Sequence, residues 1–454
     1  MTTFSHSSTI NFPRDAVFVW HNHPGALTRI NPHWAGSVVQ EAASLEPGER
    51  AKLAAAVPGT RGLITQQCVS EQTDLSANSF SDRMIKGPFR TWNHTHHFDE
   101  RGQQTTVRDH VEYEVLPRFP LKKLVNCYLE KMMAERNRRL AADLAFHARY
   151  NSKPLTVVIA GASGMVGTQV SALLGGGGHT VRHLVRHTPK SNHEFQWDPD
   201  QGQIDESVFD GADAVIHLGG ATISTRFTEE NKKKILDSRV KSTTLLAETL
   251  AQRVHDGGPQ TFICASAIGY YGADRGGELL REDSGAGKDF LANVCLQWES
   301  ACDAARAAGV RVVNVRTGLV QSVLGGMLRV QLPLFLTGTG GAVGTGTQMQ
   351  SWISLDDIAG IYVHALLTES LEGPVNAVAP HPVTARELTR TVGKVLRRPA
   401  ALPIPPFAPA LLLKKQGAKE LTLADQNVSC SKLEASGYRF FETDLLTAMR
   451  HELG

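Results

Sequence analysis

The sequence has few cysteines, almost no net charge and no long apolar run, and each shortage excludes a class of protein. Its six cysteines form no Cys-x-x-Cys pair, which predicts free thiols in a reducing compartment. The 47 basic and 45 acidic residues leave a formal charge of +2, which gives no general attraction to nucleic acid or an anionic membrane. No segment approaches the roughly 18 apolar residues that span a bilayer, and no secretory signal is visible. We therefore expect a cytoplasmic protein that binds neither nucleic acid nor membrane.

The chain of 454 residues is long enough for about two or three domains, and local patterns divide it into three. Residues 1–150 contain apolar–polar alternation, as in Trp92–Phe98, and end in a helical pattern over about Leu121–His147, which predicts an antiparallel sheet with a packed helix. Residues 154–395 alternate short apolar runs with helical patterns, which predicts a parallel sheet covered on both faces. A proline-rich stretch opens a small third domain, residues 396–454.

A glycine-rich turn lies at the start of the second domain, where residues 157–167 read Val-Val-Ile-Ala-Gly-Ala-Ser-Gly-Met-Val-Gly. An apolar strand followed by closely spaced glycines and a helix is how a dinucleotide pyrophosphate is held. Glycine lets the backbone approach the phosphates, and the helix N-terminus attracts their charge. We predict cofactor contacts from Gly161, Ser163, Gly164, Met165, Val166 and Gly167.

The residue after the second predicted strand, Arg186, bears on the choice of cofactor. A carboxylate about 20 residues after the glycines binds the ribose hydroxyls of NAD, but it would repel a 2′-phosphate. Arg186 can pair with that phosphate instead. We therefore predict NADP, with NAD the less favoured cofactor. The alternative is that Arg186 is a solvated charge at the end of a strand.

A third apolar strand ends at a glycine pair, Gly219 and Gly220. Bare backbone at the carboxyl edge of a parallel sheet can lie beside a bound cofactor. Close packing of a strand on a helix is the alternative. We predict cofactor contacts from Leu218, Gly219, Gly220 and Ala221.

The motifs that follow come in a recognisable order: Asp213-x-Val-x-His-Leu-x-Gly220, Ser266-Ala-Ile-Gly-Tyr-Tyr-Gly272 and Arg316-x-Gly318. With the glycine turn, they resemble the extended short-chain dehydrogenase/reductase superfamily. Asp237-Ser-Arg-Val and Gln348-x-x-Ser-Trp-Ile353 are similar to its atypical branch of NAD(P)-dependent nucleotide-sugar epimerase-like proteins. The resemblance covers about residues 155–450 and implies an α/β Rossmann fold, a doubly wound parallel sheet. Within it we predict further cofactor contacts from Ser266, Thr317 and Leu319.

The first domain resembles a helix-grip domain of the START or polyketide-cyclase type. The resemblance rests on Phe18–Trp34, Trp92-x-His-x-His-x-Phe98 and Asp109-x-Val-x-Tyr113 before the long helix. It implies an α+β domain with an antiparallel sheet and a hydrophobic small ligand.

Catalysis by hydride transfer needs a proton relay on the substrate hydroxyl, and the superfamily resemblance implies a serine and a Tyr-x-x-x-Lys pair for it. Ser266 stands where the serine is expected, but Leu291 and Cys295 occupy the tyrosine and lysine positions. Because leucine cannot ionise and a neutral thiol has no charge, they cannot carry the usual proton transfer. Tyr270, or Tyr271 beside it, is the candidate substitute, and a packed aromatic is the competing interpretation. We predict Ser266 and Tyr270 as catalytic residues, and leave open whether the chain is an enzyme.

A second glycine-rich stretch, residues 338–346, leads into Gln348 and Trp352. Its backbone N–H groups could bind a substrate diphosphate, and Trp352 could stack on a base or sugar. The alternative is a flexible surface loop. We predict substrate contacts from Gly340, Gly341, Gln348 and Trp352.

Histidine is concentrated in the first domain, which holds half of the chain's 18 histidines. His94 and His96 share one face of a predicted strand. Two imidazoles can ligate zinc, but the spacing places no third ligand. We therefore predict that this strand lines a core or a ligand pocket, and that the chain has no metal site.

Three functions fit these patterns. The first is an NADP-dependent oxidoreductase or epimerase that acts on a nucleotide sugar or similar small molecule. The second is a non-catalytic NADP-binding redox sensor or scaffold, which the missing Tyr-x-x-x-Lys pair favours. The third is a carrier of a hydrophobic ligand in the first domain, regulated by the Rossmann domain. A homodimer through the helices near 231–250 and 290–308 is expected by analogy with the superfamily only.

Overall fold

The computed structural model describes residues 1–114, 118–150, 152–400 and 402–454. They form two compact units. The first comprises Met1–Ser152, Ala172–Gly178 and Arg450–Gly454, and the second comprises Lys153–Ser171 and His179–Met449. None of the described helices is both long and apolar enough to cross a membrane.

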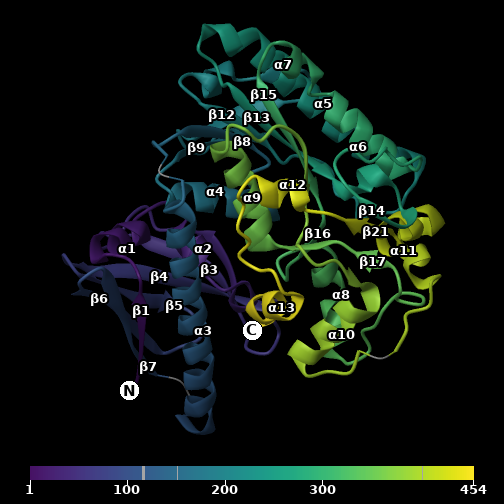
Figure 1. The fold of residues 1–454 in the computed structure, drawn as a ribbon. Coiled ribbons are helices and arrows are strands. Elements are labelled where there is room, and N and C mark those ends of the chain that lie inside the picture. The colour runs from purple at the N-terminus through teal and green to yellow at the C-terminus, as the bar shows by residue number, and fades with distance from the viewer. Residues whose placement is uncertain (115–117, 151, 401) are drawn as a thin grey trace. The chain divides into compact units, whose positions relative to one another are not determined.

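The first unit is built on a seven-stranded antiparallel sheet with the strand order β1-β7-β6-β5-β4-β3-β2. Its strands are β1 (Thr2–Ile10), β2 (Gly36–Gln40), β3 (Arg50–Ala56), β4 (Thr65–Leu75), β5 (Ser79–Lys86), β6 (Thr91–Arg101) and β7 (Gln104–Glu114). Its helices are α1 (Arg14–His21), α2 (Ala26–Ile30) and the long α3 (Arg118–His147). Figure 1 shows α3 running across this sheet. The helix-grip expectation is confirmed.

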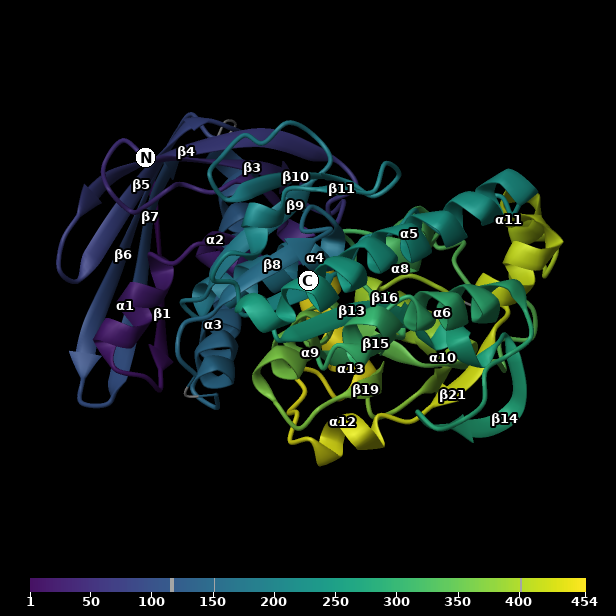
Figure 2. The ribbon, with the colours of Figure 1, turned by 90° about the horizontal axis from the view of Figure 1, so that it is seen from above.

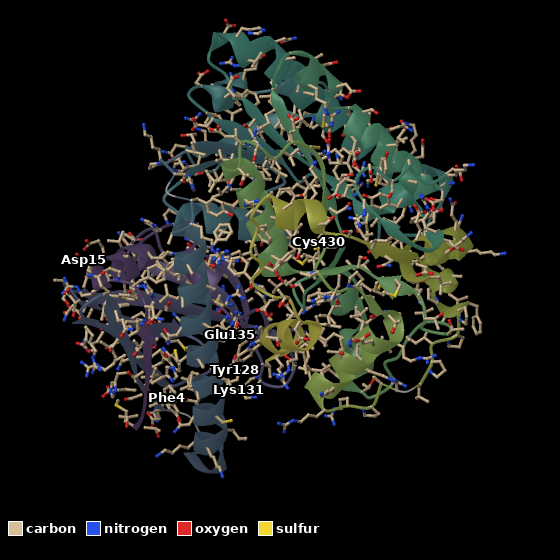
Figure 3. The ribbon with its side chains drawn as sticks, viewed as in Figure 1. Phe4, Asp15, Tyr128, Lys131, Glu135 and Cys430 are labelled. Carbon is tan, nitrogen blue, oxygen red and sulfur yellow. The ribbon has the colours of Figure 1, made fainter. Side chains whose placement is uncertain are left out.

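Apolar side chains fasten α3 to the sheet in two clusters. Phe80, Phe98 and Val107 from the strands pack with Leu140 and Leu144 from α3 in one of them. The other cluster contains Phe4, Val111, Tyr113, Leu129, Met133 and the partly buried Tyr128. Figure 3 labels Phe4 on β1 and Tyr128 on α3. Alternation along the strands directs these residues to one face of the sheet.

The second unit is built on an eight-stranded sheet with the order β11-β10-β9-β8-β12-β13-β15-β19. Its strands are β8 (Thr156–Ala160), β9 (Thr180–Val185), β10 (Glu194–Asp198), β11 (Gln203–Ile204), β12 (Ala214–His217), β13 (Thr261–Ala267), β15 (Arg311–Thr317) and β19 (Gly373–Ala377). All neighbouring pairs are parallel except β10 with β11. The chain moves outward in opposite directions from β8 and β12, as in a doubly wound Rossmann sheet. The predicted fold class is confirmed.

Helices cover both faces of this sheet. They are α4 (Met165–Gly176), α5 (Glu229–Arg253), α6 (Phe290–Ser300), α7 (Asp303–Ala307) and α9 (Leu355–Leu367). In Figure 1, α5, α6 and α7 lie on one face, and α4 and α9 on the other. Right-handed crossovers from β8 to β9 and from β12 to β13 require α4 and α5 to take opposite faces.

The remaining elements lie in the second unit, except that α13 continues past Met449 into residues of the first. They are β14 (Asp274–Leu280), β16 (Leu319–Gln321), α8 (Gly326–Leu336), β17 (Met349–Gln350), β18 (Trp352–Ser354), β20 (Val383–Thr384), α10 (Ala385–Leu396), α11 (Ala408–Gly417), β21 (Asp425–Val428), α12 (Ser431–Ala435) and α13 (Leu445–Leu453). Strand β21 pairs in parallel with β14, and Figure 2 shows the two side by side. The sequence-based domain boundaries, 1–150, 154–395 and 396–454, remain predictions.

Candidate cofactor site

The glycine turn after β8 is packed so tightly that side chains would not fit at two of its glycines. Gly161 has a φ of +90°, and a Cβ there would lie 2.8 Å from the Gly219 nitrogen. A Cβ at Gly167 would lie 2.2 Å from the carbonyl oxygen of Gly161. The Gly164 N–H donates to that same oxygen at 3.1 Å, and α4 begins at Met165. The free N–H groups of the α4 N-terminus therefore lie directly after bare backbone, as a pyrophosphate site requires.

The end of β12 lies against this turn because β8 and β12 are neighbouring parallel strands. Ala160 is paired with His217, and the Leu218 N–H donates to the Ala160 oxygen at 2.8 Å. The Ala221 N–H donates to Ser238 Oγ at 2.9 Å. The structure thus brings the predicted cofactor residues 161–167 and 218–221 together at the point where the strand order reverses, the place where such sheets bind ligands.

Two arginines, Arg186 and Arg239, carry positive charge near the glycines. Arg186 is exposed and is the first residue after β9. Arg239 on α5 donates to the backbone oxygens of Ala221 and Ile235, both at 3.0 Å. A Cβ at Gly220 would lie only 3.1 Å from Arg239 Cζ. Among the described residues, no carboxylate lies within 4.0 Å of the Arg239 side chain, so its charge is available to an anionic ligand.

The pKa of the His217 imidazole reflects the positive charge around it. Burial, followed by the charges of Arg239 and Arg186, lowers the pKa of His217 to about 3. Its Nε2 lies 2.8 Å from Ser242 Oγ. The ring is therefore neutral at physiological pH, and the two arginines supply positive charge close to it.

Arg239 was not among the predicted site residues. The signal for it is the Asp237-Ser-Arg-Val motif, which carries the resemblance but gives no role to the arginine. Its place beside Gly220 follows from the packing of α5, which local spacing does not predict.

Ser266 lies near the end of β13 and is already engaged. Its hydroxyl donates to Glu299 Oε1 at 2.6 Å. Glu299 on α6 accepts two hydrogen bonds of 2.9 Å from Nε and Nη2 of Arg316 on β15. Arg316 is 2% exposed and Glu299 13%, so this is a buried bidentate ion pair with the serine bound to it.

The two tyrosines after Ser266 have different surroundings. The Tyr271 hydroxyl donates to Asn376 Oδ1 at 2.6 Å and accepts from Arg316 Nη1 at 3.0 Å. Burial raises the pKa of Tyr271 to about 12. The Tyr270 ring lies 3.5 Å from the Arg316 Cζ, stacked against the guanidinium. Within the described part of the chain the Tyr270 hydroxyl has no hydrogen-bond partner, so of these two tyrosines Tyr270 has the free phenol.

Leu291 and Cys295 lie on helix α6, close to Gly269, which directly precedes these tyrosines. A Cβ at Gly269 would lie 3.6 Å from Leu291 Cβ and 3.7 Å from Cys295 Sγ. Burial, aided by the charge of Glu299, raises the pKa of Cys295 to about 12. The thiol is therefore neutral at physiological pH and is neither a cation nor a nucleophile.

The residues predicted to bind substrate have structural contacts of their own. A Cβ at Gly341 would lie 1.8 Å from the Leu402 oxygen, and one at Gly340 would lie 2.4 Å from the Phe335 ring. Gln348 donates to the Val343 oxygen at 3.2 Å. These contacts explain the glycines and the glutamine by packing alone, and their substrate role remains a prediction.

Three further predicted residues, Thr317, Leu319 and Trp352, lie at or just beyond the carboxyl end of β15. Trp352 is fully buried, and its indole N–H donates to the His381 oxygen at 2.9 Å. Thr317 ends β15, and Leu319 in β16 is paired with Trp352. A buried indole with a satisfied donor has no face open for stacking, so substrate binding by Trp352 would require this part of the chain to rearrange.

Comparison with known proteins assigns the second unit. Residues 157–377 match the family model described as NAD dependent epimerase/dehydratase family. A protein of Mycobacterium bovis named epimerase family protein is 38% identical over 294 residues, which are 64% of this chain and 96% of the relative. The chain belongs to the NAD-dependent epimerase/dehydratase family. Residues 404–452 match a domain of unknown function, and residues 10–144 match polyketide cyclase/dehydrase and lipid transport.

Two solved structures of epimerase-family proteins extend the comparison. The crystal structure of a nucleoside-diphosphate sugar epimerase from Corynebacterium glutamicum covers 100% of this chain and 90% of that chain, with 35% identity and a TM-score of 0.81. The structure of the human epimerase family protein SDR39U1 with NADPH covers 66% of this chain and 99% of that one, with 29% identity and a TM-score of 0.59. The similarity to the Corynebacterium protein includes both units.

Proposed function

We propose that this family member is an NADP-dependent oxidoreductase or epimerase that acts on a nucleotide sugar or a similar small molecule. The observation that carries the proposal is the close approach of Gly161 to Gly219, with Arg239 beside Gly220 and Arg186 at the end of the neighbouring strand β9. Bare backbone suits a pyrophosphate, the exposed guanidinium of Arg186 suits the further phosphate of NADP, and Arg239 adds positive charge beside the glycines. The NADPH in the human relative and the name of the Corynebacterium relative support the cofactor and the substrate class.

NADP would supply hydride transfer when bound, and the chain must then supply the proton. We infer that Tyr270 exchanges the proton with the substrate hydroxyl, because its phenol is free of other partners. Arg316 fixes the orientation of the Tyr270 ring by stacking on it at 3.5 Å. Glu299 in turn holds Arg316 in place. In this arrangement Ser266 is a positioning residue that supports the ion pair.

A non-catalytic NADP sensor is the second candidate, and a specific observation favours it. Leu291 and Cys295 replace the tyrosine and lysine that the superfamily uses, and Ser266 is bound to Glu299. A site with these residues can bind cofactor and report its presence without turnover.

The two candidate functions predict the same NADPH binding but different turnover. Purified protein is titrated with NADPH and NADH by fluorescence. NADPH oxidation is then followed across a panel of carbonyl compounds, and nucleoside-diphosphate sugars are monitored by NMR for epimerisation. Preference for NADPH with either reaction supports the first candidate, whereas tight NADPH binding with neither reaction supports the sensor. Equal weak binding of both cofactors contradicts both.

Two tyrosine variants sharpen the first candidate. Tyr270→Phe should abolish turnover and leave NADPH affinity unchanged, because it removes only the free hydroxyl. Tyr271→Phe is the matched comparison. It loses two buried hydrogen bonds and should cost about 1–3 kcal/mol of stability. Full turnover by Tyr270→Phe would remove Tyr270 from the reaction.

A further inference from the structure

A polar cluster interrupts the apolar face of the antiparallel sheet in the first unit. It consists of Asp82 on β5, His94 and His96 on β6, and Asp109 on β7. Both histidines and Asp109 are at most 4% exposed. The apolar clusters of Phe98 and of Val111 flank these groups on the same strands. Buried polar groups destabilise a core unless they have partners or a ligand, so this cluster calls for an explanation.

The register of three neighbouring strands assembles the cluster. Asp82 lies directly opposite His94, and His96 lies directly opposite Asp109. Directly opposite residues point to the same face of a sheet. The ligand-capable atoms of Asp82, His94 and His96 all lie within 4.8 Å of one another. A third ligand for the two histidines therefore comes from the neighbouring strand.

Asp109 occupies one nitrogen of each imidazole. Its Oδ1 lies 3.2 Å from His94 Nε2 and 2.8 Å from His96 Nδ1. The other nitrogen of His94, Nδ1, lies 3.7 Å from Asp82 Oδ2, which is too long for a hydrogen bond. A carboxylate that holds the far nitrogen of a ligating histidine, leaving the near nitrogen free, is the usual outer partner of a zinc site.

We propose that Asp82, His94 and His96 bind a divalent transition-metal ion, with Zn²⁺ the best match, and that Asp109 orients both imidazoles. Two imidazoles and a carboxylate form a three-ligand zinc set whose fourth position is left to water or a ligand. Zinc ligands at about 2.0–2.1 Å from the ion are about 3.3 Å apart. Asp82 Oδ2 lies 3.7 Å from His94 Nδ1, so it must move closer to reach this spacing. Rotation of the Asp82 side chain, which at 16% is the most exposed of the three, would bring the oxygen closer.

The cluster and its surroundings hold more carboxyl groups than guanidinium groups, which favours a bound cation. Arg136 on α3 lies close enough for its charge to act on both Asp82 and Asp109. The cluster therefore sets the charge of two carboxyl groups against that of one guanidinium in a buried place. A metal ion compensates that charge, and a shared proton is the competing way to do so.

The test is zinc binding by the full chain, purified without a histidine tag and dialysed against a chelator. Calorimetric titration with ZnCl₂ should give one site per chain. Asp109→Asn should weaken Zn²⁺ binding by about 10–100-fold, as loss of an outer partner does. Asp82→Asn and His96→Gln should abolish the site. The matched control is His97→Ala, on the same strand but exposed, which should bind Zn²⁺ like the natural chain.

Two readouts separate a metal site from a loss of folding. Zn²⁺ should raise the melting temperature of the natural chain and of His97→Ala, but not that of Asp82→Asn. Co²⁺ should give the absorption bands of a low-symmetry site only where Zn²⁺ binds. If His96→Gln fails to fold, Asp82→Asn, which keeps the side-chain shape, decides the question. No saturable site in the natural chain, or equal Zn²⁺ affinity in Asp82→Asn, would overturn the proposal and leave a proton-sharing network.

Discussion

At the scale of single residues, the cofactor site depends on where two positive charges lie. Arg186 is exposed at the end of β9, whereas Arg239 is held by two backbone oxygens beside Gly220. A free guanidinium can pair with a phosphate that NADP has and NAD lacks. An arginine already held by backbone oxygens is better suited to a phosphate or ribose common to both cofactors. We therefore expect Arg186 to distinguish NADP from NAD, and Arg239 to contribute to the affinity for both cofactors.

Arg186→Glu should weaken NADPH binding about 10–100-fold, since a charged hydrogen bond contributes about 1.5–3 kcal/mol. The affinity for NADH should change only a few-fold. Fluorescence titration of both cofactors measures the difference, and Arg186→Gln, which removes the charge without reversing it, should fall between. An unchanged preference for NADPH in Arg186→Glu would exclude Arg186 from the site.

At the scale of elements, the turn between β8 and α4 joins two segments of the candidate cofactor site. Gly167→Ala would place a Cβ 2.2 Å from the Gly161 oxygen, whereas at Gly164 the nearest atom is 3.3 Å away. The Gly167 variant should therefore lose about 1–3 kcal/mol of stability and most of its NADPH affinity. Gly164→Ala should keep its stability and lose affinity, because its methyl group obstructs the phosphates. Chemical denaturation and NADPH titration separate the two, and equal stability losses would contradict this account of the turn.

The elements and the glycine turn could be predicted from the sequence because their signals are local. Residues 157–167 hold a strand, a turn and a helix start in consecutive positions. Glu299, by contrast, reaches Ser266 across 33 residues through the packing of α6 on β13. Asp82 reaches His94 only through strand register. Neither partner has a spacing signal, so the buried ion pair and the polar cluster could not be found before the fold.

At the scale of the whole molecule, buried histidines link stability to pH. Burial lowers the pKa of His364 to about 4 and that of His217 to about 3, and it also lowers the pKa of His179. Below pH 6.5 the unfolded chain takes up protons at these positions while the folded chain does not. The free energy of unfolding therefore falls as the pH falls. Buried Asp357 acts in the opposite direction, because burial raises its pKa to about 7.

His183 adds a fourth imidazole whose pKa burial lowers. Four imidazoles outweigh one carboxyl, so the second unit should be less stable at pH 5.5 than at pH 7.5. His217 and His364, whose pKa values lie furthest below that of a free imidazole, should each contribute on the order of 1 kcal/mol over that interval. Thermal unfolding of cofactor-free protein, followed by circular dichroism at both pH values, measures the change. His364→Gln removes a group that titrates in the unfolded chain, so its melting temperature should depend less on pH. Exposed His187→Gln is the matched control and should keep the pH dependence of the natural chain. A His364→Gln variant with the same pH dependence as the natural chain would contradict this account, because the imidazole would then take up its proton alike in the folded and the unfolded chain.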